Sequence, residues 1–187
     1  MALRVPSSCS EWFWSHNAVE VVEFGRLTDA RRAELAGDEV DPFDDEDATL
    51  RYRPKDRHVA LRDGRGRLIA SAGLLTTEVE VAGACFLAVG LGGVIVNTEF
   101  RERGLARRVI QAALDRARTM GPEFMMLFCH GDRVGLYERL GFTQVSSPVS
   151  VCQPDGLAEM PLRTMWQALR PQASWPVGEV SVHGMPF

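Results

Sequence analysis

Residues 86–129 constrain the fold more than any other part of the sequence, because apolar strand patterns flank one amphipathic helix pattern there. Residues 86–96 form a long apolar run that is typical of a buried strand. In residues 105–117 apolar side chains recur every three or four positions, which predicts a helix with one buried face. Residues 124–129 are apolar throughout, as in a central strand. Together these patterns predict an α/β protein with a central sheet.

Weaker patterns extend this prediction in both directions. Short apolar and β-branched runs indicate further strands, and Asp63-Gly64 is a hairpin turn signal. Thr28 can cap a helix that runs through Ala36 and ends at Gly37. The other expected elements are strands over 19–24, 58–62 and 68–81, a short helix over 132–140, and strands near 143–151 and 163–169.

The composition is that of one globular domain, which we place at residues 1–187. The chain is 45% hydrophobic and 25% charged, which provides for a sizeable core. A formal net charge of −4 argues against a nucleic-acid binder, which would present a basic face. No apolar run reaches the roughly 18 residues of a membrane helix, and the first residues lack a signal-peptide pattern, so we expect no membrane association.

The cysteines and histidines are scattered along the chain rather than paired. None of the spacings matches a structural zinc or iron–sulfur motif, so no metal site is expected from the sequence. Cysteines without a pairing pattern also fit a reducing compartment, and we expect a cytoplasmic protein. The residues concerned are Cys9, Cys85, Cys129, Cys152, His16, His58, His130 and His183.

The loop that opens the 105–117 helix has the chemistry of a diphosphate site. A helix start offers unpaired N–H groups and the positive end of the helix dipole. Small residues at Gly104 and Ala106 let phosphate oxygens approach those amides. Four arginines add positive charge there, namely Arg101, Arg103, Arg107 and Arg108. The loop is not a Walker motif, because no Gly-Lys-Ser/Thr follows, and alone it could also be a plain surface turn.

Glycines within the preceding strand admit two explanations. Gly90, Gly92 and Gly93 could mark a splayed strand whose free main-chain groups bind a ligand, or simply tight packing of a neighbour. They do not form a dinucleotide fingerprint, because the third glycine is missing and no helix starts there. Further on, Tyr137 lies in a short helix pattern. Its hydroxyl could protonate a departing thiolate, or the ring could belong to the core.

Together these motifs resemble the GNAT superfamily of N-acetyltransferases. The resemblance lies in residues 94–96, 101–106 and 136–142. It implies an α/β fold with a mixed, mostly antiparallel central sheet flanked by helices, and acetyl-CoA as acyl donor. It also implies Tyr137 as general acid, direct attack of an amine on the thioester, and a main-chain N–H of the glycine-bearing strand as oxyanion donor. The implied cofactor-binding residues are Val94, Val96, Arg101, Glu102, Arg103, Gly104, Ala106 and Arg107.

A more particular resemblance concerns the acceptor. Residues 38–47 are strongly acidic, which would attract a cationic amine, although most charge runs are simply solvated. Residues 41–47, the Tyr137 helix and residues 175–180 resemble the aminoglycoside 2′-N-acetyltransferases of antibiotic resistance. Residues 174–178, in the same tail at about 171–187, also resemble the nodulation N-acyltransferase. Both imply an amino-sugar acceptor, with Asp41, Asp44, Asp45 and Glu179 as substrate-binding residues and the tail contributing to the acceptor site.

The base that deprotonates the amine is not identified by these motifs. The aminoglycoside enzymes carry a carboxylate on the cofactor strand, where this chain has Gly92. His130 is favoured, because histidine titrates near neutral pH; Glu179, Glu99 and a water chain are alternatives. A peptide, protein or small-metabolite amine remains open as acceptor, as does a non-catalytic acyl-CoA-binding sensor. The resemblance further allows a homodimer.

Overall fold

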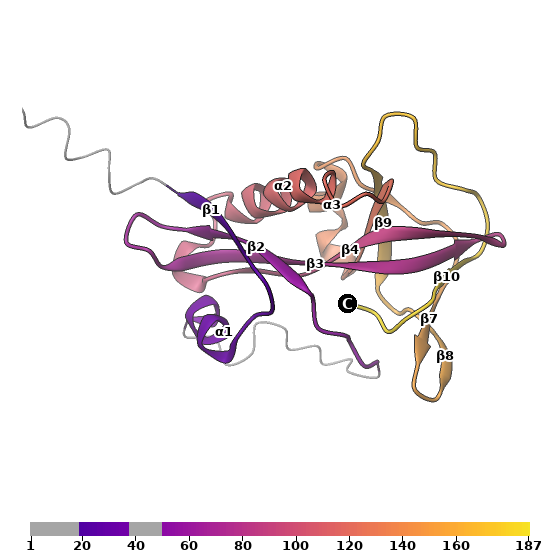
Figure 1. Cartoon of the computed structure of the whole chain (residues 1–187), viewed down its shortest axis with the longest axis horizontal. Helices are drawn as coiled ribbons and strands as arrows, with labels where there is room; N and C mark the ends of the chain where they lie inside the picture. The colour runs from indigo at the N-terminus through magenta and orange to yellow at the C-terminus, as the bar shows by residue number, and fades with distance from the viewer. Residues whose placement is uncertain (1–18, 38–49) are drawn as a thin grey trace, which may run out of the picture.

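The apolar runs of the sequence assemble into one curved sheet with helices on both faces (Figure 1). The computed structural model describes residues 19–37 and 50–187. The strands in this part of the chain are β1 (Glu20–Phe24), β2 (Arg57–Arg62), β3 (Leu68–Val81), β4 (Ala84–Val96), β5 (Phe124–Cys129), β6 (Thr143–Gln144), β7 (Val149–Gln153), β8 (Gly156–Glu159), β9 (Arg163–Ala168) and β10 (Val180–Val182). The helices are α1 (Asp29–Ala36), η1 (Thr98–Phe100), α2 (Leu105–Ala117), η2 (Gly131–Arg133) and α3 (Val134–Glu138).

The sheet is mixed and mostly antiparallel, as the sequence predicts. Its order is β6-β9-β5-β4-β3-β10-β7-β8, and β2 with β1 pairs along the first half of β3. Among the described strands only β4 with β5 and β10 with β7 run parallel. The long strand β3 therefore pairs with β4 on one side, and with β2 and then β10 on the other.

Helices α1 and α2 cover opposite faces of this sheet, as Figure 1 shows. Alternate residues of β2 demonstrate it, because Val59 and Leu61 pack in the α2 core whereas Ala60 packs with Leu35 of α1. The buried face of α2 matches the sequence pattern: Leu105, Val109, Ile110, Ala113, Leu114 and Ala117. Thr28 caps α1 by accepting a hydrogen bond from the Arg31 N–H, and Gly37 ends it with a φ of +61°.

Two segments differ from the predicted elements. The helix expected over 132–140 is a short η2 turn followed by α3, and the strand expected over 143–151 is divided into β6 and β7. Pro148 lies in that break, where it cannot donate a ladder hydrogen bond. Within the described ranges, no helix combines the length and apolar character needed to cross a membrane. The acidic run 38–47 lies outside the described residues.

Candidate active site

Strands β4 and β5 lie side by side over only part of their length. They pair where residues 88–91 of β4 face residues 124–127 of β5. Beyond this, β4 continues through residues 92–96, while residues 128–129 keep their pairing with β9. The carboxyl ends of the two parallel strands therefore diverge. On this side of β4, residues 92–96 have no ladder partner within the described chain, so their main-chain N–H and C=O groups can bind a ligand.

A bulge in β4 explains why the strands diverge. Opposite β3, the pairing steps from Ser71 with Ile95 to Gly73 with Gly92, so β4 carries one extra residue. Gly93 accommodates it with a φ of +58°, in the left-handed region that favours glycine. A bulge bends its strand and increases the twist, which turns β4 away from β5 where their pairing stops.

Tight packing explains the other two glycines of β4. A Cβ at Gly90 would lie 2.6 Å from the Phe187 ring, and one at Gly92 would lie 2.8 Å from Cε of Lys55. The main chain of Phe187 would be equally close to a Cβ at Gly92, at 2.7 Å. We call the place where the carboxyl ends of β4 and β5 diverge the opening, and Phe187 and Lys55 adjoin it. No local sequence signal points to them, because their place depends on contacts far along the chain.

The loop before α2 is shaped like an anion cradle. Gly104 is the N-cap in a left-handed conformation (φ +71°), no side chain caps the helix, and Glu102 also has a positive φ of +62°. Helix hydrogen bonding begins with the Arg108 N–H donating to the Gly104 carbonyl. Residues 105–107 therefore start the helix with N–H groups that lack intrahelical partners. A Cβ on Gly104 would meet nothing within 4 Å, so the approach is open. This loop fits a diphosphate.

Arginines surround this loop, as the sequence predicts. Arg101, Arg103 and Arg107 are all exposed. Arg101 Nε donates to the Val96 carbonyl (3.4 Å), which ties the loop to the end of β4. The Arg103 guanidinium lies 5.2 Å from the centre of the Phe100 ring. Ala106 is half-buried in the first turn of α2, and Val94 and Val96 are half-buried at the diverging end of β4.

Tyr137 is buried in α3, with its ring edge-on to Phe142 at a centroid distance of 5.7 Å. Burial raises the pKa of Tyr137 to about 12; the nearby Cys129 thiol acts in the same direction and Arg133 opposes it. Burial and Asp132 likewise raise the pKa of Cys129 to about 11. The Tyr137 hydroxyl is therefore protonated at neutral pH, as a proton donor must be.

Because the pKa of Tyr137 is raised in the folded state, the free energy of unfolding should depend on pH in the alkaline range. The tyrosine ionises near pH 10 in the unfolded chain and near about 12 in the folded one, so the unfolded state loses its proton first. The free energy of unfolding should fall as pH rises through that window, by about 2–3 kcal/mol. Tyr137→Phe should lack this component, so urea unfolding of both proteins across the window gives the difference. Parallel pH profiles would contradict it.

The predicted base candidates lie in different places. His130 is exposed and follows β5 directly, so it lies at the edge where β4 and β5 diverge. Glu99 is also near this edge, in η1, and forms an ion pair with Arg67 at 3.5 Å. Glu179 does not reach the opening. Its carbonyl accepts a hydrogen bond from Ala82 in the β3–β4 turn, at the opposite end of β4.

The remaining acceptor residues divide between the tail and the undescribed segment. Asp41, Asp44 and Asp45 lie outside the described residues. The tail joins the sheet as strand β10 and then continues to the opening. There the Arg53 N–H donates a hydrogen bond to the Pro186 carbonyl at 2.8 Å. Its last residue, Phe187, packs on Phe128 with ring centroids 5.0 Å apart. The structure thus brings the end of the tail, but not Glu179, to the predicted site.

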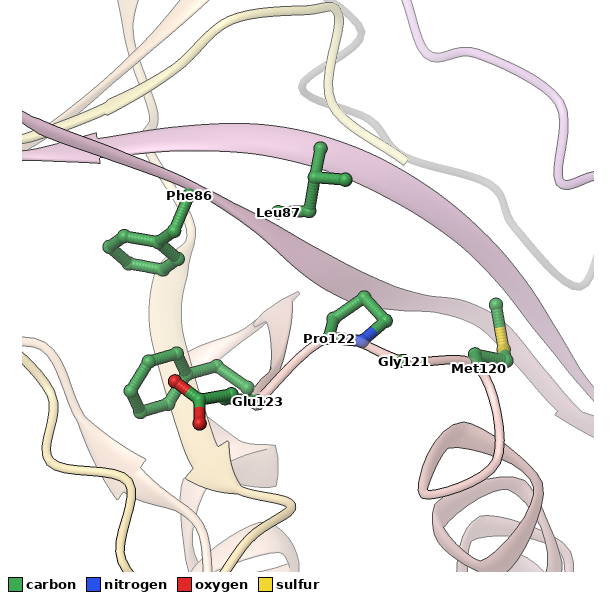
Figure 2. Close-up of a pocket in the computed structure, with 7 residues that line it drawn as sticks. Phe86, Leu87, Met120, Gly121, Pro122 and Glu123 are labelled. Atoms are coloured by element: carbon green, nitrogen blue, oxygen red, sulfur yellow. The ribbon is translucent and has the colours of Figure 1, made fainter.

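A separate apolar pocket of about 400 Å³ lies away from this opening. Figure 2 shows Phe86 and Leu87 of β4 beside Pro122 and Glu123 of the loop that precedes β5. These residues belong to the start of both strands, whereas the divergence is at their carboxyl ends. The pocket is therefore distinct from the candidate active site.

Solved structures share this architecture. YhbS of Escherichia coli, in complex with CoA, is 21% identical, with 90% of this chain and 96% of that chain covered and a TM-score of 0.54. ElaA of Escherichia coli is 18% identical, with coverages of 80% and 99% and a TM-score of 0.52. A protein described as a bacterial toxin is 17% identical, with coverages of 82% and 92% and a TM-score of 0.59. At these identities the similarity concerns the fold.

A match to a protein-family model identifies the class to which this fold belongs. The family model of the acetyltransferase (GNAT) domain matches residues 34–145, well over half of the sequence. The chain belongs to the GNAT family, which confirms the resemblance at this level. It is an N-acetyltransferase, and acetyl-CoA is its acyl donor. No curated protein matches the chain significantly in sequence.

Proposed function

We propose that this enzyme acetylates a primary amine of a small cationic acceptor, an amino sugar of the aminoglycoside type. The observation that carries the proposal is the opening between β4 and β5 together with the exposed start of α2 at Gly104, whose loop contacts the end of β4 through Arg101. One extended ligand could place its diphosphate on the helix amides and its thioester beside residues 92–96. An amine approaching from the side of Phe187 would then meet the acyl carbon.

The binding roles follow from the available main-chain groups. The N–H groups of residues 105–107, with Arg103 and Arg107, would hold the diphosphate. The main chain at Val94 and Val96 would hydrogen-bond the amides of the pantetheine arm, in place of the missing strand partner. A β4 N–H near the bulge would stabilise the oxyanion that develops on the thioester carbonyl.

Two side chains would move the protons. His130, at the edge of the opening, would take a proton from the ammonium group and leave a nucleophilic amine. The amine nitrogen then bonds to the acyl carbon and releases its second proton to solvent, from which Tyr137 is later reprotonated, and the carbon–sulfur bond breaks. Tyr137, kept protonated by burial, would donate its proton to the departing sulfur. The products are an amide and a free thiol.

The acceptor class rests on charge and on the tail. Residues 38–47 carry seven carboxylates in ten positions, which favours a polycation over a neutral or anionic amine. Phe187 adjoins Gly90 and Gly92, so the end of the tail can form one wall of the acceptor site. Glu179 is not included in this wall, because its main chain lies at the β3–β4 turn.

A panel of amines tests the acceptor. We expect thiol release from acetyl-CoA with aminoglycosides, at a kcat/KM at least about tenfold above that with peptides carrying a free N-terminus or lysine. Neutralising Asp44 and Asp45 together should raise KM for the aminoglycoside about tenfold, because each lost charge removes long-range attraction.

The matched control neutralises Asp155 and Glu159, two exposed carboxylates on the β7–β8 hairpin, and should leave KM unchanged. Turnover of peptides without turnover of aminoglycosides would show that the acceptor is a peptide amine rather than an amino sugar. Binding of acetyl-CoA with no turnover of any amine would favour an acyl-CoA sensor and overturn the proposed reaction.

A further inference from the structure

Four side chains that can bind metal gather on an exposed face of the sheet, at the β3–β4 turn end. Glu78 and Glu80 alternate on β3 and so project from the same face. Cys85 of β4 pairs directly opposite Glu80. His183 follows β10 immediately, and its N–H donates to the Glu78 carbonyl at 2.9 Å. Figure 1 places β10 beside this part of β3.

The donor atoms of these residues lie close together. Ligand atoms of Glu78, Cys85 and His183 are all within 4.8 Å of one another. His183 Nδ1 is 3.1 Å from Glu78 Oε1, and His183 Nε2 is 3.1 Å from Glu80 Oε2. Cys85 Sγ is 3.8 Å from the same Glu80 oxygen. Ligands of one tetrahedral zinc ion lie about 3.3–3.6 Å apart, so small rotations of these exposed side chains are sufficient.

The imidazole of His183 lies between two carboxylates, with one at each ring nitrogen. The ring can therefore donate an N–H to one carboxylate while its other nitrogen binds a metal ion beside the second. A metal ion on Nδ1 would bind Glu78 as well, and Nε2–H would then donate to Glu80. A ligating histidine that donates its other N–H to a carboxylate is the common outer-shell arrangement of zinc proteins.

We propose that Glu78, Cys85 and His183 bind one divalent transition-metal ion of the zinc type, with Glu80 orienting the imidazole. Thiolate, imidazole and carboxylate are the ligands that zinc takes in proteins, and three protein ligands leave a fourth position for water. The ligands come from β3, β4 and the end of β10, so no short sequence motif predicts the site. His183 and Glu78 are 105 positions apart.

The ion would also fasten the tail to the sheet. His183 is followed by residues 184–187, which end against Gly90 and Gly92 at the opening. A bond from His183 to an ion held by β3 and β4 fixes the point from which this segment departs. The site itself is independent of the proposed acceptor, because its ligands lie at the other end of β4.

Calorimetric titration of the full chain with Zn²⁺ tests the site. One equivalent should bind, and Cys85→Ser and His183→Ala should each weaken binding at least about 100-fold. Glu80→Gln should weaken it about 10- to 100-fold, the usual effect of removing an outer-shell carboxylate. With Co²⁺ in place of Zn²⁺, a thiolate-to-cobalt charge-transfer band should appear and should be lost in Cys85→Ser.

The matched control is Cys152→Ser, a half-buried thiol on β7 that should leave the affinity and the cobalt band unchanged. Zn²⁺ should also raise the unfolding temperature of the native chain but not of His183→Ala. Cys85 is exposed, and the side chains of His183 and Glu80 are 36% and 39% exposed, so these variants should fold, and circular dichroism checks this. The absence of Zn²⁺ binding to the native chain, or native Zn²⁺ affinity in the Cys85→Ser and His183→Ala proteins, would overturn the proposal.

Discussion

Replacing Tyr137 with phenylalanine should lower kcat about 10²- to 10⁴-fold, the usual contribution of general acid–base catalysis, with acetyl-CoA affinity nearly unchanged. The substitution removes only the hydroxyl, since the ring packs edge-on against Phe142 and phenylalanine keeps that contact. Burial raises the tyrosine pKa to about 12, so the hydroxyl that the substitution removes carries its proton at neutral pH. Steady-state thiol release and calorimetry with acetyl-CoA measure the two quantities separately.

The second tyrosine of the chain supplies the control. Tyr52 is half-buried against the core cluster that contains Phe187, whereas Tyr137 belongs to the core cluster under α2. Tyr52→Phe should leave kcat within about threefold, because no proton transfer is assigned to it. If Tyr137→Phe retains native turnover, or Tyr52→Phe loses as much, another group donates the proton to the leaving sulfur.

Local patterns were sufficient for the elements that frame the opening. The apolar positions of 105–117 predict α2 because a 3.6-residue period has one buried face. The loop before α2 is equally local, since a small residue at Gly104 and the helix start are neighbours in sequence. Strands β3, β4 and β5 were predictable for the same reason. Each is long or apolar enough to be recognised as a buried strand without knowing which strand it pairs with.

Elements that depend on distant partners were not predictable. β10 has three residues, too few for a periodicity, and it exists because β3 and β7 offer edges on either side. Gly90 and Gly92 stand out in the sequence, but their cause, the approach of Lys55 and Phe187, is set by tertiary contacts. Glu179 appeared suitable as a substrate-binding residue or base on sequence grounds, yet the strand that follows it holds its main chain at the far turn.

Replacing Gly104 with glutamate should weaken acetyl-CoA binding roughly 100-fold. A carboxylate about 5 Å from a phosphate charge costs about 3 kcal/mol at the effective dielectric constant of a protein surface. The side chain itself would not clash, because a Cβ at Gly104 meets nothing within 4 Å. The effect should therefore come from charge and from the left-handed φ of +71°, which costs a non-glycine residue about 1–2 kcal/mol.

Gly83→Glu separates charge at the cofactor from backbone strain. Gly83 has a φ of +85° and equally open surroundings, but it lies in the β3–β4 turn at the opposite end of β4. The two variants should lose similar stability in urea unfolding, while only Gly104→Glu should lose acetyl-CoA affinity in calorimetry. The acetyl-CoA affinity of Gly104→Ala should lie between those of the native chain and Gly104→Glu, since alanine introduces the backbone strain without the charge. Equal affinities for Gly104→Glu and Gly83→Glu would mean that the diphosphate does not rest on the amides that open α2.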